Sequence, residues 1–271
     1  MKAVRVLPCA NVLGVGLSAT NLPAATDYLI RAAQAGMRGY VCVTGVHGVT
    51  EAQNDPAFRE ILNRALLNVP DGMPMSWVGW AQGHQQMDRV YGPDLMLAIL
   101  DRSVPLGLTH FFYGGKAGVA DLLAKKMTGR FPGLQVVGTY CPPFRPLTES
   151  ERENLRARVA GLKPDFFWIG LSTPKQERCA AEFCQILDAK LFLAVGAAFD
   201  FHAGLVSQAP RWMQRSGLEW LYRLCTEPRR LWKRYLINNP LFIGRIVLQL
   251  SGFRRFSSGR RSRRRFFRGR T

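Results

Sequence analysis

The sequence predicts an α/β fold, a mainly parallel sheet with helices on both faces that is followed by a C-terminal helical appendage. Short apolar runs typical of strands alternate with segments of helical periodicity, and most connections between them are short. Alternation of this kind builds a parallel sheet covered by helices on both faces. After Gly196 the composition changes to a stretch rich in Trp, Tyr and Arg without strand alternation, and this change predicts the appendage.

The predicted strands are short runs of mainly apolar residues, at residues 12–17, 40–44, 66–69, 108–113, 134–139, 166–171 and 191–195. The predicted helices between them cover residues 23–37, 55–65, 93–103, 117–129, 149–160 and 174–187. Pro93 suits the first turn of its helix, and Asp94 suits the positive end of the helix dipole. Thr173, with Pro174 and Gln176 after it, predicts a capped helix start. The resulting order of elements is Rossmann-like.

The formal net charge of the 271-residue chain is +18, and it is concentrated near the end. Residues 228–271 contain fourteen Lys and Arg and no Asp or Glu, which leaves +4 for everything before them. The last residues are low in complexity and strongly self-repelling, so they are not expected to fold alone. We therefore predict an α/β core over residues 1–197, a helical appendage over 198–250 and a basic disordered tail over 251–271.

The cysteines and the N-terminus indicate the compartment. Six scattered cysteines form no C-x-x-C pair and no Cys/His spacing of a zinc site, which favours thiols in a reducing environment. The basic and apolar N-terminus is interrupted by Pro8 and Asn11 and lacks a convincing cleavage site, so it is a poor signal peptide. No run of about 18 apolar residues exists to span a bilayer. We expect a cytoplasmic protein.

The sequence argues against a dinucleotide cofactor and against a metal-bound nucleotide. The segment GVGLSA, residues 14–19, fits G-x-G-x-x-A but overlaps the first predicted strand and does not follow it. A nicotinamide enzyme also needs an acidic residue at the end of the second strand, where Thr44 and Gly45 stand. No two aspartates form the D-x-D arrangement that holds a metal on a nucleotide sugar. We therefore expect neither a cofactor nor a metal ion.

Thr44 and Asp71 predict a site at one edge of the sheet. Thr44 ends one predicted strand, and Asp71 follows the next. In an open α/β sheet, ligands bind beyond the carboxyl ends of the strands, so both side chains should reach one crevice. Asp71 precedes Gly72, an ordinary turn pair, and the turn alone is one explanation for it. The alternative is a general base that takes a proton from an attacking hydroxyl.

Two strand-to-helix junctions could approach a phosphate. Gly114 and Gly115 lie between a predicted strand and helix, where a plain tight turn and a close backbone approach to a nucleotide are both open. They form no Walker motif, because Ala117 follows the lysine. The helix start at Thr173 is explained by capping, and its unpaired N–H groups can also bind a phosphate.

Several basic residues have both a structural and a functional explanation. Arg89 is a solvated arginine beside a helix start or a bidentate ligand of a diphosphate. Arg223, Arg230 and Lys233 follow one another at intervals of seven and three, near one side of a helix, with tryptophans interspersed. Such a segment is a packed, partly exposed helix pair or a surface for an anionic membrane.

These motifs resemble the WecG/TagA/CpsF family of bacterial glycosyltransferases. The likeness runs from about Val12 to Pro240. It includes, in order, PDGM, RVYGPDL, FYGG, GLSTPKQE, VGAAFDFHAG, GLEWLYRL followed by EPRR, and KRYL. GLEWLYRL followed by EPRR is the most specific block.

The resemblance implies an inverting, metal-independent transfer of a sugar from a UDP-sugar to a polyprenyl-diphosphate-linked sugar, in exopolysaccharide or cell-envelope synthesis. The enzyme would be peripheral on the inner face of the cytoplasmic membrane, with the appendage facing an anionic surface. Asp71 would deprotonate the acceptor hydroxyl, with Thr44 and Gln176 near the donor and acceptor. The predicted substrate-binding residues are Arg89, Gly114, Gly115, Glu177, Arg223, Arg230 and Lys233. The last three match positions that close over the site and neutralise the diphosphate.

One departure concerns the donor sugar, and one alternative concerns the whole function. Family members that add N-acetylmannosamine often carry Asn two residues after the Thr, where this chain has Val46 and then His47. This difference argues against an acetamido sugar and leaves UDP-glucose or a uronic-acid donor open. The alternative function is nucleic-acid binding, since the tail interleaves Arg with Phe as a single-strand binder does. The crevice does not need that function, so nucleic acid is not the partner we expect.

Overall fold

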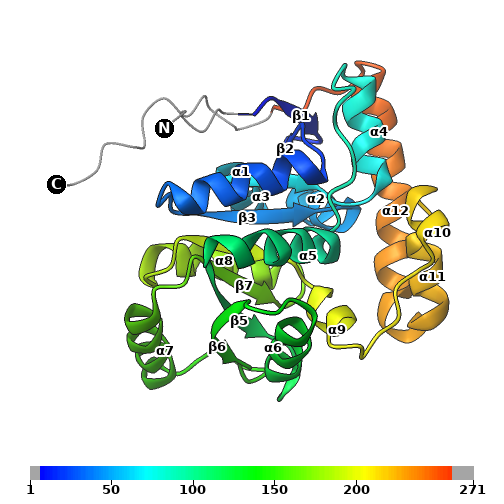
Figure 1. Ribbon diagram of the computed structural model, residues 1–271. Coiled ribbons are helices and arrows are strands. Elements are labelled where there is room, and N and C mark those ends of the chain that lie inside the picture. Colours follow the sequence, from blue (N-terminus) through cyan, green and yellow to red (C-terminus); the bar gives the residue numbers. More distant parts are fainter. Residues whose placement is uncertain (1–6, 258–271) are drawn as a thin grey trace.

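The computed structural model describes residues 7–257, except for the side chains of Arg230 and Arg234. Its centre is a six-stranded, fully parallel sheet in the order β4-β3-β8-β7-β5-β6 (Figure 1). The strands are β3 (Gly39–Thr44), β4 (Leu67–Pro70), β5 (Thr109–Gly114), β6 (Gln135–Tyr140), β7 (Phe166–Gly170) and β8 (Leu191–Ala194). The predicted fold class is confirmed.

Successive residues of the central strands supply two different cores, as the two-residue period of a strand requires. Phe166 and Trp168 of β7 point to one face, while Phe167 and Ile169 point to the other. The first face is covered by α1 (Leu22–Gln34), α5 (Gly92–Ser103), α6 (Val119–Arg130) and α9 (Ala198–His202), with the short η1 (Val104–Leu106) after α5. The second is covered by α7 (Glu149–Leu162) and α8 (Lys175–Ile186). Because both faces are covered, the strands are apolar throughout.

The N-terminal strand predicted over residues 12–17 is wrong, because the chain turns back on itself there. The structure has an antiparallel hairpin, β1 (Cys9–Val12) and β2 (Val15–Ser18), apart from the main sheet. Leu13 and Gly14 form its two-residue turn with φ of 52° and 84°, and Asn11 Oδ1 accepts a hydrogen bond from the Gly14 amide. Two consecutive residues with positive φ match the twist of a tight hairpin.

A third core lies between the hairpin and helices from distant parts of the sequence. It includes residues of α2 (Val46–Asn54), α3 (Pro56–Arg64) and α4 (Met73–Ala81). The helices α2 and α4 were not predicted. Phe242 and Ile246 of the C-terminal helix α12 (Pro228–Leu250) also join this core. The helix α12 is thus packed against the N-terminal hairpin.

The segment after Gly196 is helical, as predicted. Besides α9 and α12 it contains α10 (Arg211–Arg215) and α11 (Glu219–Thr226), which lie with α4 at one side of the molecule (right in Figure 1). Gln249 of α12 accepts a hydrogen bond from the Leu13 amide at 2.7 Å, and Asn11 Nδ2 donates to the Phe256 carbonyl at 2.6 Å. The domain boundaries at residues 197 and 250 stay predictions, and most of the predicted disordered tail, from residue 258 on, lies outside the described residues.

Candidate active site at the carboxyl ends of the sheet

A cavity of about 1700 Å³ lies beyond the carboxyl ends of the strands, beneath α11 and α12. The segments after β3, β4, β5, β7 and β8 all contribute to its wall. The predicted site residues at its surface are Asp71, Gly115, Gln176, Arg223 and Lys233. Parallel strands bring their carboxyl ends to the same edge, so side chains separated by more than a hundred residues meet here.

Thr44 and Asp71 are neighbours across two paired strands. The Asp71 amide donates to the Thr44 carbonyl at 2.9 Å, and Asp71 lies in the cavity wall. A Cβ on Gly45 would lie 2.9 Å from the Asp71 carbonyl oxygen and 3.6 Å from its Oδ2, so glycine lets the two strand ends approach. Thr44 is buried just behind this wall, and its Oγ1 has no hydrogen-bond partner. The strand ends therefore bring a carboxylate and an unsatisfied hydroxyl together.

Gln176 also lies in the cavity wall, in the first turn of α8. The helix begins at Lys175, and Thr173 does not cap it; the predicted N-cap is wrong because the Thr173 hydroxyl donates to Glu177 Oε1 at 2.8 Å instead. Gln176 Nε2 also donates to Glu177 Oε1, at 3.0 Å. Gln176 Oε1 is buried without a partner, 3.2 Å from where a Cβ on Gly196 would be. An acceptor without a partner at this place is available to a hydrogen-bond donor of a ligand or a water molecule.

Gly114 and Gly115 hold the end of β5 close to β7. The φ of Gly114 is 139°, and a Cβ there would lie 2.4 Å from the Gly170 carbonyl oxygen. The Gly115 amide donates to the same oxygen at 2.9 Å. Gly115 and Lys116 reach the cavity surface. The two glycines are required by the close approach of two strands, and Gly115 also brings its backbone to the cavity.

Arg89 is bound within the protein. Its Nη1 donates to Gln214 Oε1 at 2.8 Å, its Nη2 to Glu219 Oε2 at 2.5 Å, and its Cζ lies 4.0 Å from the centre of the Tyr91 ring. Its side chain is 9% exposed. The guanidinium therefore ties α10 and α11 to the core, and its predicted contact with a diphosphate stays a prediction.

Two of the three predicted cations of the appendage reach the cavity. Arg223, on α11, is largely buried, with its Nη2 3.7 Å from Glu227 Oε1 and its Cζ 5.7 Å from the Phe201 ring centre. Lys233 of α12 is exposed, 5.5 Å from the Trp232 ring centre. Arg230 lies one turn before Lys233, but its side chain is outside the described part of the structure. The described pair brings two cations to the part of the cavity wall that α11 and α12 form.

Comparison with known proteins identifies the family. The model of the glycosyl transferase WecG/TagA/CpsF family matches residues 10–256, nearly the whole chain. This protein belongs to that family. It is 30% identical over 186 residues to an N-acetylglucosaminyldiphosphoundecaprenol N-acetyl-beta-D-mannosaminyltransferase of Bacillus spizizenii (strain ATCC 23059 / NRRL B-14472 / W23), covering 69% of this chain and 70% of the relative. A protein of the same name from Bacillus subtilis (strain 168) is 26% identical over 185 residues, covering 68% and 70%. The chain is a glycosyltransferase.

The sequence did not single out Tyr91, a buried residue of the transferase that lines the cavity. Burial raises the pKa of its hydroxyl well above the usual value, and the negative charges of Glu219 and Asp71 add to this effect. The hydroxyl therefore stays protonated and remains a hydrogen-bond donor. The RVYGPDL block, which contains Tyr91 and Arg89, was the only signal for it.

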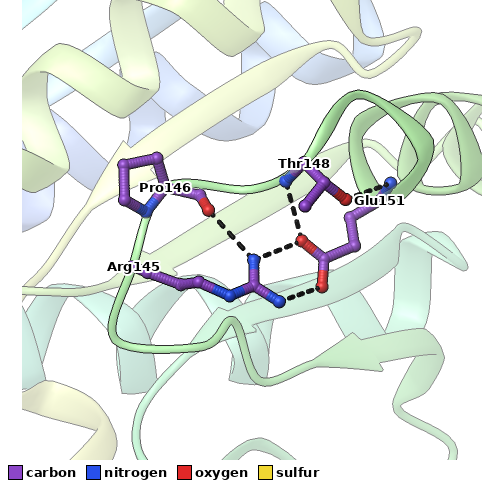
Figure 2. Close-up of polar contacts among 4 residues, drawn as sticks. All are labelled: Arg145, Pro146, Thr148 and Glu151. Atoms are coloured by element: carbon purple, nitrogen blue, oxygen red, sulfur yellow. Dashed lines mark hydrogen bonds and ion pairs between the residues drawn. The ribbon is translucent and has the colours of Figure 1, made fainter.

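A proline-rich loop, residues 142–147, forms the rim of the transferase's cavity near α7. Figure 2 shows how it is held: Arg145 makes two hydrogen bonds to Glu151, at 2.7 and 2.8 Å, and one to the Pro146 carbonyl. Glu151 also accepts from the Thr148 amide, and its own amide donates to Thr148 Oγ1, which completes a capping box (Figure 2). The Arg145 contact and these bonds lower the pKa of Glu151 to about 2.

Two further observations on the described residues of the transferase concern metal binding and membrane insertion. Within residues 7–257, no three His, Cys, Asp or Glu side chains come together as a metal-binding group. Among the described helices, none combines the length and the apolar character that crossing a bilayer requires.

Proposed function

We propose that this transferase moves a sugar from a UDP-sugar to a polyprenyl-diphosphate-linked sugar, with inversion and without a metal ion, in exopolysaccharide or cell-envelope polysaccharide synthesis. The family match and the names of both Bacillus relatives support a lipid-linked acceptor. The single observation that carries the proposal is the shared cavity, because it exposes Asp71, Gln176 and the cations Arg223 and Lys233 to the same space. Its place of action would be the inner face of the cytoplasmic membrane.

In the proposed reaction Asp71 is the general base. The acceptor hydroxyl gives its proton to the Asp71 carboxylate as its oxygen bonds to the anomeric carbon. The bond from that carbon to the UDP oxygen breaks on the opposite side, and UDP leaves with the electron pair. One such displacement inverts the anomeric centre. Gln176, in the cavity wall, would hold the sugars in line for it, and Thr44 would support the strand end beside Asp71 from behind the wall.

The positive groups of the cavity would replace the electrostatic role of a metal ion. Lys116 and Lys175 line the cavity close to the N-terminus of α8 and would face the UDP diphosphate, while Arg223 and Lys233 line it from α11 and α12 and would face the diphosphate of the acceptor. Cations fixed before the reaction stabilise the charge that develops on a leaving diphosphate. The N-terminus of α8 adds its positive dipole end.

The donor sugar depends on the segment after Thr44. Val46 and His47 both line the cavity; the side chain of Val46 has no hydrogen-bonding group for an acetamido group, and His47 Nδ1 lies 3.0 Å from Asn238 Nδ2 of α12. The candidate donor sugars are therefore a hexose, a uronic acid and an N-acetylhexosamine. A panel of UDP-sugars, tested for UDP release with diphosphoundecaprenol-linked N-acetylglucosamine, separates these donors.

Asp71→Asn tests the mechanism. We expect turnover to fall by about 100-fold or more, the scale on which a general base acts, with UDP-sugar binding and folding nearly unchanged. Asp88→Asn is the control, because Asp88 is exposed and lies outside the cavity. Undiminished turnover of Asp71→Asn would remove Asp71 from the mechanism.

Membrane attachment is proposed from the charge of the last residues. Residues 258–271 contain seven arginines and no acidic residue, and each cation near an anionic bilayer contributes about 1 kcal/mol. Sedimentation with anionic liposomes should weaken with salt and with deletion of these residues. A preference for RNA without liposome binding would favour the nucleic-acid alternative.

A further inference from the structure

The cavity is larger than one substrate headgroup needs, and its wall changes character along its length. Ligand pockets are typically about 300–1,000 Å³, against about 1700 Å³ here. The strand ends line it with polar groups such as Asp71, Gln176 and Lys175, whereas α4 and the second half of α12 line it mainly with apolar side chains. The polar end already accounts for a nucleotide sugar, so the apolar end remains to be explained.

One face of α12 forms the floor of this apolar end. Its members recur at intervals of three or four, which places them on one side of the helix over about 20 Å. They are Leu236, Pro240, Ile243, Val247 and Leu250. Phe242 and Ile246 on the neighbouring face are buried in the third core and fix the helix in place. The stripe is therefore held rigidly while its own side chains stay exposed to the cavity.

The helix α4, which begins two residues after Asp71, supplies further apolar wall. Met73, Pro74 and Trp77 line the cavity from consecutive turns. The Trp77 ring reaches the turn between α10 and α11, where a Cβ on Gly217 would lie 2.8 Å from its Cη2. Because α4 begins two residues after Asp71, its apolar wall continues from the proposed base without a break.

We infer that the groove between α4 and α12 holds the isoprenoid chain of the acceptor, an inference that rests on the proposed function and adds a lipid site to it. The groups that line the cavity match the parts of such a lipid, namely an apolar stripe, two cations and a carboxylate. The apolar stripe of α12 would take the chain, Arg223 and Lys233 the diphosphate, and Asp71 the sugar hydroxyl. A free nucleotide or sugar has no long apolar part to match the stripe. Because the groove belongs to the same cavity as Asp71, the lipid-linked acceptor fits it better than an unrelated apolar partner.

The test compares two pairs of substitutions on the same helix. The groove pair is Ile243→Gln with Val247→Gln, whose side chains are 61% and 59% exposed and line the cavity. The control pair is Leu241→Gln with Leu248→Gln, which are 45% and 42% exposed but lie outside the cavity lining. Both pairs change exposed positions, so neither should unfold the protein, and thermal melting of each variant checks this.

Binding of radiolabelled undecaprenyl diphosphate and geranyl diphosphate is measured on the full chain in detergent micelles. The groove pair should raise the Kd for the long lipid by about tenfold or more and leave the Kd for the short one within about twofold. The control pair should change neither. Equal losses in both pairs, or equal losses for both lipids, would overturn the groove.

The remaining outcomes distinguish a lipid groove from a dimer contact, and the groove from the proposed function. A dimer that the groove pair converts to a monomer, with lipid binding unchanged, would assign this face to a second copy of the chain and overturn the inference. Binding of the long lipid as expected, without UDP release from any UDP-sugar, would refute the proposed function alone. Transfer that proceeds with the long-lipid Kd unaffected by the groove pair would refute the groove alone.

Discussion

Replacing Arg89 by Ala should loosen α10 and α11 from the core. The guanidinium joins Gln214 and Glu219 to the Tyr91 ring, and the two helix residues are 125 and 130 positions away in the sequence. Gln214 Nε2 donates in turn to the Ala209 carbonyl at 2.7 Å, so one network fixes the connection into α10 as well. Arg89→Ala removes its centre and leaves the Glu219 carboxylate, 18% exposed, without its arginine.

The expected loss of stability is about 3 kcal/mol. Removing one partner of a buried ion pair costs about 3–5 kcal/mol, and the partial exposure of Glu219 places this pair at the low end. Urea unfolding of Arg89→Ala, Glu219→Gln and the double variant gives the coupling between the two residues, expected at about 1–2 kcal/mol. Arg215→Ala, an exposed arginine on α10, is the control.

The kinetic consequence follows from the position of these helices over the cavity. If α11 moves, Arg223 moves with it, so KM for the lipid acceptor should rise more than KM for the UDP-sugar. Limited proteolysis between α9 and α11 should speed up in Arg89→Ala. An unchanged urea midpoint together with lost UDP-sugar binding would refute this reasoning and make Arg89 a direct substrate ligand.

Three other predictions concern single positions. Thr44→Val should leave the free energy of unfolding unchanged or slightly raised, because the buried Thr44 Oγ1 has no hydrogen-bond partner to lose. The same substitution should lower kcat/KM at least tenfold, and an unaltered kcat/KM would exclude Thr44 from the reaction. Gly114→Ala should lower the free energy of unfolding in urea by about 2 kcal/mol or more, since its Cβ would meet the Gly170 carbonyl at 2.4 Å, whereas Gly129→Ala in α6, where nothing is close, should be neutral or stabilising. Burial lowers the pKa of His110 to about 3 from its usual 6.5, so the unfolded state binds the proton first. The free energy of unfolding should therefore fall as pH drops from 6.5 toward 3, by about 1.4 kcal/mol per pH unit at most. His110→Gln should flatten this slope in urea titrations at several pH values, and an identical slope would exclude His110 as its source.

The sheet and its site edge were predictable because the information is local. Each strand is a short apolar run followed by a helical segment, and consecutive β3 and β4 pair side by side. Thr44 and Asp71 therefore meet without any knowledge of the rest of the fold. Sequence order alone placed them at the same edge of the sheet.

The N-terminal hairpin was not predictable from periodicity. Its turn lies within an apolar run, where Leu13 takes a positive φ that residues other than glycine rarely adopt. Hydrogen bonds to Gln249 of α12 stabilise the turn: the Leu13 amide donates to Gln249 Oε1, and Gln249 Nε2 donates to the Asn11 carbonyl. A contact across more than 230 residues has no trace in local composition.

The surroundings of Arg89 were hidden for the same reason. A motif indicates that an arginine is used but not what it binds, and here Gln214 and Glu219 occupy both terminal nitrogens. The segment that contains Arg223, Arg230 and Lys233 was expected as a packed, partly exposed helix pair or as a surface for an anionic membrane. In the structure, Phe242 and Ile246 of α12 are buried in the third core while Ile243 and Val247 stay exposed in the cavity lining, which only the packing of α12 on the hairpin and α2 could reveal.

The packing of α12 connects the proposed lipid groove with the strand end that carries Thr44. Asn238 of α12 lies 3.0 Å from His47 of α2, and α2 begins two residues after Thr44. Phe242 and Ile246 press the same helix onto the third core. A lipid chain bound along the exposed stripe would restrict α12 and, through His47, the strand end beside Asp71. Occupation of the groove should therefore order the donor side of the cavity, so that long-chain acceptors lower KM for the UDP-sugar as well as their own.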